Sequence, residues 1–203
     1  MHDLKDFDFD KRASRYDRSM GKGVRRFYAL LIEQVELFPG ADVLDVGCGT
    51  GALLRKMADT CQINGYGIDI SENMVAEARA KCPDMDIQVS RCESTPFETG
   101  AFDIVTACLA YHHFADKEGF ALEAARLLKP GGALYIADPR FPLIVRKFVN
   151  GLFKHLNTAG EINTSQEIFE CLGKYGFSPD GHVYDGFAQA VKLVRGQGEG
   201  RRC

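Results

Sequence analysis

Apolar residues in this chain follow two spacings that alternate along it. Short, nearly continuous apolar runs are typical of strands buried on both faces. Between these runs, apolar residues recur every three or four positions, as on one face of a helix. The strand-like runs are 43–46, 65–70, 87–89, 102–108 and 133–137, and the helical stretches are 22–37, 52–59, a segment beginning at Ser71, and 116–128. This alternation predicts an α/β domain built on a mostly parallel sheet.

The last third of the chain departs from this alternation. After Pro142, apolar side chains recur along one helical face, which predicts an amphipathic helix within a segment at about 139–163. Such a helix can cap a cleft, form an apolar wall for a substrate, pair with another subunit or be buried as a structural helix. A capping box at 164–167 then predicts another helix, and residues 182–184 and 188–194 predict two final antiparallel strands.

Three glycines at alternate positions follow the first predicted strand. Gly47, Gly49 and Gly51 predict a tight turn that opens a helix, with backbone N–H groups free to approach a ligand. Asp45, two residues earlier, suits a ligand that carries an amino group and positive charge, and its charge would repel a pyrophosphate. No Gly-Lys-Ser/Thr follows, so the turn is not a P-loop.

A second acidic residue ends the next predicted strand. Asp69 lies about twenty residues beyond the glycines, where nucleoside-binding βαβ units place the acid that binds ribose hydroxyls. The acid at each of the two positions points to an adenosyl ligand.

Six short motifs occur in order over about residues 40 to 195. They are Leu44-Asp45-Val46-Gly47-Cys48-Gly49-Thr50-Gly51, Gly67-Ile68-Asp69-Ile70-Ser71, Pro96-Phe97, Phe102-Asp103-Ile104-Val105, His112-His113 and Leu128-Lys129-Pro130-Gly131-Gly132. With these motifs the chain resembles the class I S-adenosylmethionine-dependent methyltransferases. It looks most like the broad type 11 group, which includes ubiquinone- and menaquinone-biosynthesis-like enzymes.

The resemblance implies a Rossmann-like, doubly wound α/β fold. We expect a mostly parallel seven-stranded sheet with helices on both faces and an antiparallel C-terminal strand. The predicted organisation is an N-terminal arm at 1–21, a methyltransferase domain at 22–195 with a cap insertion at about 139–163, and a flexible tail at 196–203.

The resemblance also implies how the cofactor, S-adenosylmethionine, is held at its methionine end. The backbone of Gly47, Cys48 and Gly49 would approach the methionine moiety, and Asp45 would help to hold its amino group. A carbonyl near Ala107 would contact the amino acid end.

At the adenosine end, the resemblance implies that Asp69 binds the ribose hydroxyls and Ile70 flanks the adenine. Met74, otherwise a core residue, would lie beside the adenosine. Tyr16 matches an aromatic residue with which the family's N-terminal segment folds over the cofactor; a loosely ordered tail is the alternative.

Residues 90–97 resemble the loop that reads the adenine edge, with one departure from the family's pattern. Arg91 stands where the family has an acid that accepts from the exocyclic amine, and an arginine has donors only. The backbone N–H of Cys92 could still bind a ring nitrogen, and Glu93 is another acceptor.

Tyr111, His112 and His113 follow the fourth predicted strand and are candidate acid–base residues. Ligands of open parallel sheets bind at the carboxyl ends of the strands, which places this segment beside the site. Neighbouring side chains on an extended segment point in opposite directions, so we expect one histidine to face the cleft. Packing roles are the alternative. Asp138, at the end of the fifth strand, is either a binding carboxylate or a loop acid.

Charge and composition limit the other classes of function. The formal charge of −3 and pI near 6.0 indicate no general attraction to nucleic acid or an anionic membrane. There is no run of eighteen apolar residues, and the polar start does not resemble a signal peptide, so we expect a cytoplasmic protein without stable membrane insertion. Seven cysteines without a C-x-x-C pair predict reduced thiols and no metal.

We expect the enzyme to transfer a methyl group to an O, N or C nucleophile of a small-molecule acceptor, with S-adenosylhomocysteine as product, and to be a monomer or homodimer. A nicotinamide-dependent oxidoreductase is a rival, although its glycines would be spaced Gly-x-Gly-x-x-Gly. A non-catalytic adenosyl-cofactor-binding module or regulatory subunit is another. A nucleic-acid methyltransferase is the third, and the chain lacks its Asn-Pro-Pro-Tyr and Pro-Cys motifs.

Overall fold

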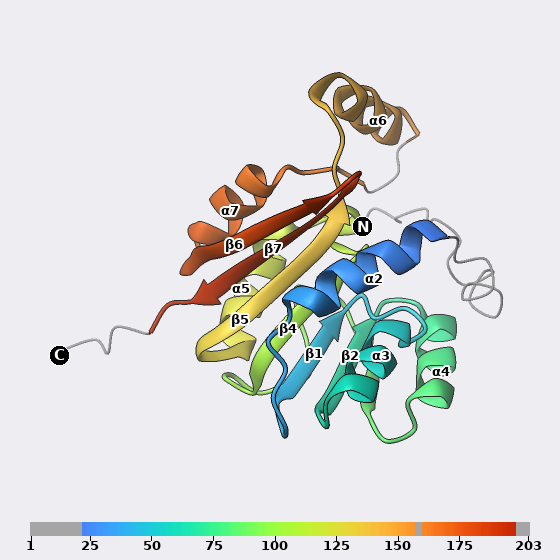
Figure 1. The fold of residues 1–203 in the computed structure, drawn as a ribbon, viewed down its shortest axis with the longest axis vertical. Helices are drawn as coiled ribbons and strands as arrows, with labels where there is room; N and C mark the ends of the chain where they lie inside the picture. Colours follow the sequence, from blue (N-terminus) through green and yellow to red (C-terminus); the bar gives the residue numbers. More distant parts are fainter. Residues whose placement is uncertain (1–21, 157–159, 198–203) are drawn as a thin grey trace.

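A seven-stranded sheet organises the protein, as the computed structural model shows for residues 22–156 and 160–197 (Figure 1). The strand order is β3-β2-β1-β4-β5-β7-β6. The strands are β1 (Asp42–Val46), β2 (Asn64–Asp69), β3 (Asp86–Val89), β4 (Phe102–Cys108), β5 (Leu128–Pro139), β6 (Phe177–Asp185) and β7 (Ala188–Arg195). The first five are parallel, and β7 runs antiparallel to both β5 and β6. The predicted fold class is confirmed.

Helices cover both faces of the sheet. They are α2 (Lys22–Gln34), α3 (Ala52–Thr60), α4 (Glu72–Lys81), α5 (Lys117–Leu127), α6 (Leu143–His155) and α7 (Ser165–Gly173), with a 3₁₀ turn, η1 (Tyr111–His113). One core joins the sheet to α2, α3 and α4, and the other joins it to α5 and α7. In Figure 1, α2 and α3 lie in front of the sheet, and α5 and α7 lie behind it.

The predicted element boundaries are confirmed at several capped ends. Ser71 accepts the backbone N–H of Met74 and so caps α4, and Thr164 and Glu167 form the reciprocal capping box of α7. Three boundaries were wrong. Strand β6, predicted at 182–184, already begins at Phe177. Helix α2 ends at Gln34, not at residue 37, and β5 begins at Leu128, ahead of the predicted run at 133–137.

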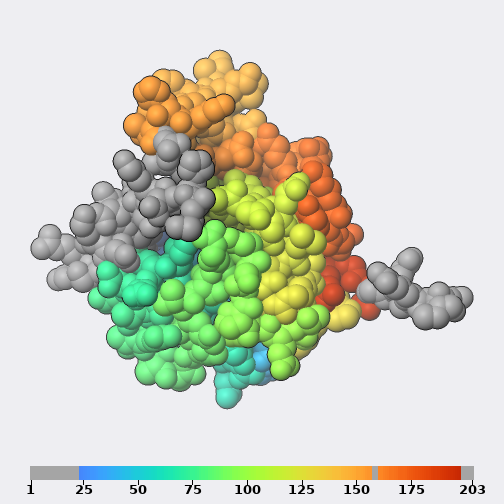
Figure 2. Space-filling model, turned by 180° about the vertical axis from the view of Figure 1, so that it is seen from behind, coloured from blue at the N-terminus to red at the C-terminus, as the bar shows by residue number. Residues whose placement is uncertain are grey.

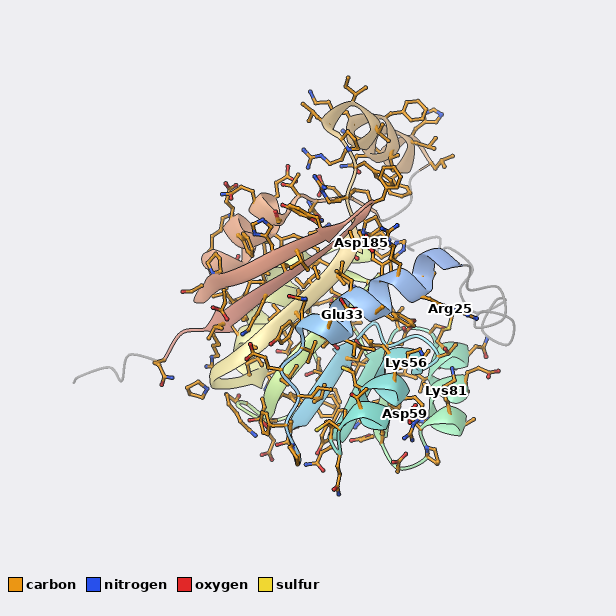
Figure 3. All side chains as sticks on the ribbon, viewed as in Figure 1. Arg25, Glu33, Lys56, Asp59, Lys81 and Asp185 are labelled. Carbon is orange, nitrogen blue, oxygen red and sulfur yellow. The ribbon has the colours of Figure 1, made fainter. Side chains whose placement is uncertain are left out.

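Lys129 connects the start of β5 to two other strands. Its Nζ lies 2.9 Å from Asp42 Oδ2 and 2.8 Å from Asp103 Oδ2, so it joins β5 to the starts of β1 and β4. A second long-range ion pair joins Arg26 of α2 to Asp185, which ends β6 beside that helix (Figure 3). Both partners of this second pair are exposed, so it adds little stability.

Helix α6 stands apart from the rest of the fold. It projects beyond the end of β5 in Figure 1, and none of its residues is buried. The alternative that this segment is a buried structural helix is therefore wrong. The other predicted roles, as a cap, an acceptor wall or an interface, remain predictions.

Candidate functional site

The glycines in the turn after β1 differ in what surrounds them. Gly47, Gly49 and Gly51 all have positive φ angles, of 73°, 52° and 73°. A Cβ on Gly47 would come within 2.7 Å of the Cβ of Ala110, so the turn touches the segment that follows β4. A Cβ on Gly49 would meet nothing within 4 Å, so space lies open against that backbone. Gly47 therefore allows close packing of protein, and Gly49 leaves room for a ligand.

Asp69 ties the glycine turn to the start of α4. Its Oδ2 accepts the N–H of Gly49 at 2.9 Å, and its Oδ1 accepts the N–H of Ser71 at 2.9 Å. The next residue, Ile70, is 52 % exposed although it is apolar. The structure thus places the predicted ribose acid and the predicted adenine neighbour at the same edge as the open space at Gly49. Val89, which pairs in register with Asp69, is also exposed and was missed in the sequence.

Asp45 lies beneath the glycine turn and is 2 % exposed. Its Oδ1 accepts a hydrogen bond from the hydroxyl group of Thr106, with 2.7 Å between the two oxygens. Burial raises the pKa of Asp45 to about 7, and the nearby charge of Asp69 adds to the shift. The carboxyl is therefore sensitive to any positive charge that comes near. Cys48 is buried too, and burial raises the pKa of its thiol well above the ordinary value, which keeps the sulfur neutral.

The loop that follows β3 uses its unusual arginine in a local contact. The Nε of Arg91 donates to Oε1 of Glu93, and the thiol of Cys92 donates to Oε2 of the same carboxylate at 3.3 Å. Arg91 is exposed, and Cys92 is half-buried. Met74 is buried on the inner face of α4, which supports its packing role.

The segment after β4 is not extended. Residues 111–113 form the 3₁₀ turn η1, so the prediction that the two histidines point in opposite directions was wrong. Their rings instead lie against each other, with centroids 4.0 Å apart. Leu109, just before the turn, has a φ of 56°, which is strained for a residue with a Cβ. Ala107 is fully buried within β4, so a contact from it to a ligand is restricted to its backbone.

His112 and Asp138 form a hydrogen-bonded pair at the ends of β4 and β5. The ring Nδ1 of His112 lies 2.9 Å from Asp138 Oδ1, and the backbone N–H of His112 donates to Asp138 Oδ2 at 2.7 Å. Both side chains are buried. A carboxylate that accepts from Nδ1–H leaves the lone pair of a neutral imidazole on Nε2. Asp138 is therefore an orienting carboxylate, a role that neither sequence alternative described.

Tyr111 does not share this arrangement. Its ring is 1 % exposed and packs edge-on against Phe114 and Phe120 in the core. Burial raises the pKa of its phenol above the ordinary value. These contacts give Tyr111 a packing role and leave His112 as the better acid–base candidate.

Sequence reasoning missed two residues beside the pair. Gln189 of β7 lies opposite Asp138 in the ladder, and its Nε2 donates to the carbonyl oxygen of Asn163 at 2.6 Å. Within the described part of the chain, the buried Oε1 of Gln189 and Oδ1 of Asn163 have no hydrogen-bond partner. A buried acceptor of this kind can accept a hydrogen bond from a water molecule or from a ligand. The sequence did offer one signal for this residue, because Gln189 is a single glutamine in a largely apolar predicted strand.

The remaining predictions concern the N-terminal arm, a metal site and insertion into a membrane. Tyr16 lies outside the described residues, as does the rest of the predicted arm. Among residues 22–156 and 160–197, no group of three or more His, Cys, Asp or Glu side chains is placed to hold a metal ion. None of the helices in those ranges has the length and apolarity that crossing a bilayer requires.

Comparison with known proteins decides the family. Residues 44–136 match the family model described as a methyltransferase domain. The chain is 30 % identical over 195 residues to a nocamycin O-methyltransferase of Saccharothrix syringae, covering 90 % of this chain and 70 % of that protein. It is 32 % identical over 176 residues to a demethylmenaquinone methyltransferase of Chlorobaculum parvum, covering 81 % of this chain and 73 % of that protein.

The chain belongs to the class I S-adenosylmethionine-dependent methyltransferases, in the type 11 group. It is therefore an enzyme of methyl transfer, and the oxidoreductase interpretation is wrong. Solved structures agree on the fold of this methyltransferase. The chain in a complex described as the Haloferax volcanii Trm112 methyltransferase activator and a putative methyltransferase superposes with a TM-score of 0.83, at 23 % identity, over 93 % of this chain and 98 % of that one.

Proposed function

We propose that this methyltransferase methylates a hydroxyl oxygen of a small-molecule acceptor, with His112 as the general base. The observation that carries the proposal is the buried His112–Asp138 pair at the carboxyl edge of the sheet. A hydroxyl is a weak nucleophile until it loses its proton, so oxygen transfer gains from a base in a way that transfer to an unprotonated amine does not. The relative named as an O-methyltransferase, which covers 90 % of this chain, supports this choice.

The residues at the ends of β1 and β2 fit S-adenosylmethionine. Gly49 offers open space and Asp69 lies beside it, which suits an adenosine ribose. Asp45 suits the amino group of the methionine moiety, and the exposed Ile70 suits a flat, apolar base. The backbone of Gly47 and Cys48 would complete the methionine end. When bound, the cofactor supplies a methyl group on a positively charged sulfur.

The protein's own contribution is then orientation and proton removal. Asp138 accepts from Nδ1 of His112, so Nε2 can take the acceptor's proton, and the carboxylate stabilises the imidazolium that results. The orphaned Oε1 of Gln189 can accept a hydrogen bond from the acceptor and hold it in line. Asp138 acts through His112 and is a positioning residue.

We also infer a cytoplasmic setting. All six cysteines among the described residues are free, which suits a reducing compartment. We also propose that the enzyme is a monomer or a homodimer.

Calorimetric titration tests the cofactor site. We expect micromolar binding of S-adenosylhomocysteine, no binding of NAD, and affinity reduced by about tenfold or more in Asp69→Ala, because charge-assisted hydrogen bonds are lost. Asp59→Ala, which changes an exposed carboxylate of α3 labelled in Figure 3, is the matched control. Unchanged affinity in Asp69→Ala would overturn the site assignment.

Product analysis tests the reaction. The protein is incubated with S-adenosylmethionine and a panel of phenols, enols, amines and electron-rich rings, and the methylated products are identified by mass spectrometry and NMR. O-methyl products that depend on His112 support the proposal. N-methyl or C-methyl products alone would contradict the oxygen assignment, whereas failure of cofactor binding would contradict the whole site.

A further inference from the structure

Among the described residues, helix α6 contacts the rest of the protein through one of its sides. The guanidinium of Arg146 pairs with Glu167 of α7. The side chain of Asn150 exchanges two hydrogen bonds with the backbone of Ile162, at 3.1 and 2.9 Å. The ring of Phe153 covers Gly160, where an added Cβ would come within 3.1 Å of it. Residues 146, 150 and 153 follow helical spacing, so one polar side, together with Phe153, holds the helix to the fold.

The opposite side of α6 is apolar and exposed. Ile144 and Phe148 are 84 % and 72 % exposed, and Leu152 lies four residues farther on the same face. Val145 and Leu156 widen it. This orientation is the reverse of an ordinary surface helix, which turns its apolar side to the core. Figure 2 shows the segment as an orange lobe that protrudes from the body of the protein.

The charge of the chain is segregated around this helix. Residues 139–160 contain four of the 25 basic residues and none of the 28 acidic ones, which leaves 21 basic against 28 acidic, a net charge of −7, in the rest of the chain. Lys147 and Lys154 lie two helical turns apart on one flank of the apolar face and make no ion pair with any described residue. Of these basic residues, Arg146 is paired with Glu167, so Lys147 and Lys154 are the two that supply positive charge beside the exposed apolar face.

We propose that α6 is a docking helix that binds the enzyme to an anionic lipid bilayer. Its apolar face would lie at the boundary between headgroups and acyl chains, and its lysines would contact lipid phosphates. Pairing with a second copy explains the same surface less well, because it brings two basic helices together. The proposal rests on α6 alone and does not depend on the acceptor proposed above. It adds a surface contact, which is distinct from a membrane-spanning segment.

Tryptophan fluorescence tests this proposal sharply, because the chain contains no tryptophan. Phe148→Trp places a single reporter on the apolar face of α6, and Leu122→Trp places a matched reporter at an exposed apolar position of α5. Dilute Phe148→Trp protein should show the emission of a water-exposed indole. Vesicles of equal parts phosphatidylcholine and phosphatidylglycerol should shift that emission to the blue, vesicles of phosphatidylcholine alone should shift it much less, and Leu122→Trp should not respond.

Cosedimentation of the unaltered protein with the same vesicles gives an independent measurement. The double variant Lys147→Glu/Lys154→Glu should bind the vesicles about tenfold or more weakly than the unaltered protein. Added salt should weaken vesicle binding of the unaltered protein. Binding of S-adenosylhomocysteine should stay unchanged in this variant, which shows that it is folded.

Three outcomes would overturn the proposal. The first is the absence of binding to the anionic vesicles. The second is a blue shift without lipid that grows with protein concentration, because it identifies a second copy as the occupant. The third is a blue-shifted emission in dilute protein without lipid, because the chain itself then covers this face.

Discussion

His112 and Asp138 are 26 residues apart in the chain and are joined by two hydrogen bonds, one from the imidazole Nδ1 and one from the backbone N–H. Both oxygens of the carboxylate are therefore used to hold a single residue. This double contact fixes the ring's position as well as its tautomer, which is what a base that takes a proton from a substrate requires. The neighbouring strands β4 and β5 bring the two residues together.

Asp138→Asn should lower kcat by about a hundredfold or more and leave the affinity for S-adenosylhomocysteine unchanged, because the amide no longer enforces the useful tautomer. The rate of methyl transfer to an acceptor found in the product screen, measured across pH, checks this. His113→Phe keeps a stacked ring beside His112 and should retain most activity. Equal losses in both variants would indicate a packing role for the segment.

Gly47→Ala should destabilise the protein by about 3 kcal/mol or more and abolish cofactor binding, because left-handed backbone strain of about 1–2 kcal/mol is joined by a clash with Ala110. Gly40→Ala is the matched control. Gly40 has a φ of 81° with nothing within 4 Å of an added Cβ, so it should show the strain alone. Urea unfolding and calorimetric titration measure the two effects. Similar losses of stability at both positions would mean that the Ala110 contact is unimportant.

Asp45 should make the stability of the ligand-free enzyme fall as pH rises from about 4 to about 7. Burial raises the pKa of this carboxyl to about 7, so the folded protein keeps a proton that the unfolded chain loses in that window. The contribution is at most about 4 kcal/mol, and Asp45→Asn should remove it. Urea unfolding at pH 5 and pH 8 checks the slope, with Asp59→Asn as control. If the slope is the same in Asp45→Asn, another group causes it.

The same shift predicts proton release when the cofactor binds. An ammonium group beside Asp45 would favour its carboxylate, so binding of S-adenosylhomocysteine at pH 6 should release a proton. Titration in buffers of different ionisation enthalpy detects this release. It should be absent in Asp45→Asn.

Arg91→Asp should preserve the affinity for S-adenosylhomocysteine or raise it by up to about tenfold, because it restores an acceptor where the adenine amine is expected. The guanidinium that it removes is exposed and contacts only Glu93 among the hydrogen-bond and ion-pair partners in the described residues. Calorimetry measures the change, and Arg55→Asp, on the surface of α3, is the control. Complete loss of binding would show that Arg91 makes an essential contact of its own.

The sequence by itself determined the sheet, the glycine turn and the positions of the two acids of the proposed cofactor site. Each depends on neighbours in the chain: apolar runs predict buried strands, and Asp45, Gly47 and Asp69 stand at fixed spacings from the strand ends that position them. The cap at Ser71 and the capping box at Thr164 are local for the same reason.

Only the tertiary structure decided the proposed acceptor side of the site and the orientation of α6. Asp138 meets His112 because β4 and β5 lie side by side. Gln189 of β7 meets Asn163 of the segment that leads to α7. No spacing in the chain encodes either pair. The apolar pattern of residues 141–156 predicted a helix but could not show which way it faces. That direction is set by Arg146 and Asn150, whose partners lie in the segment leading to α7 and in that helix.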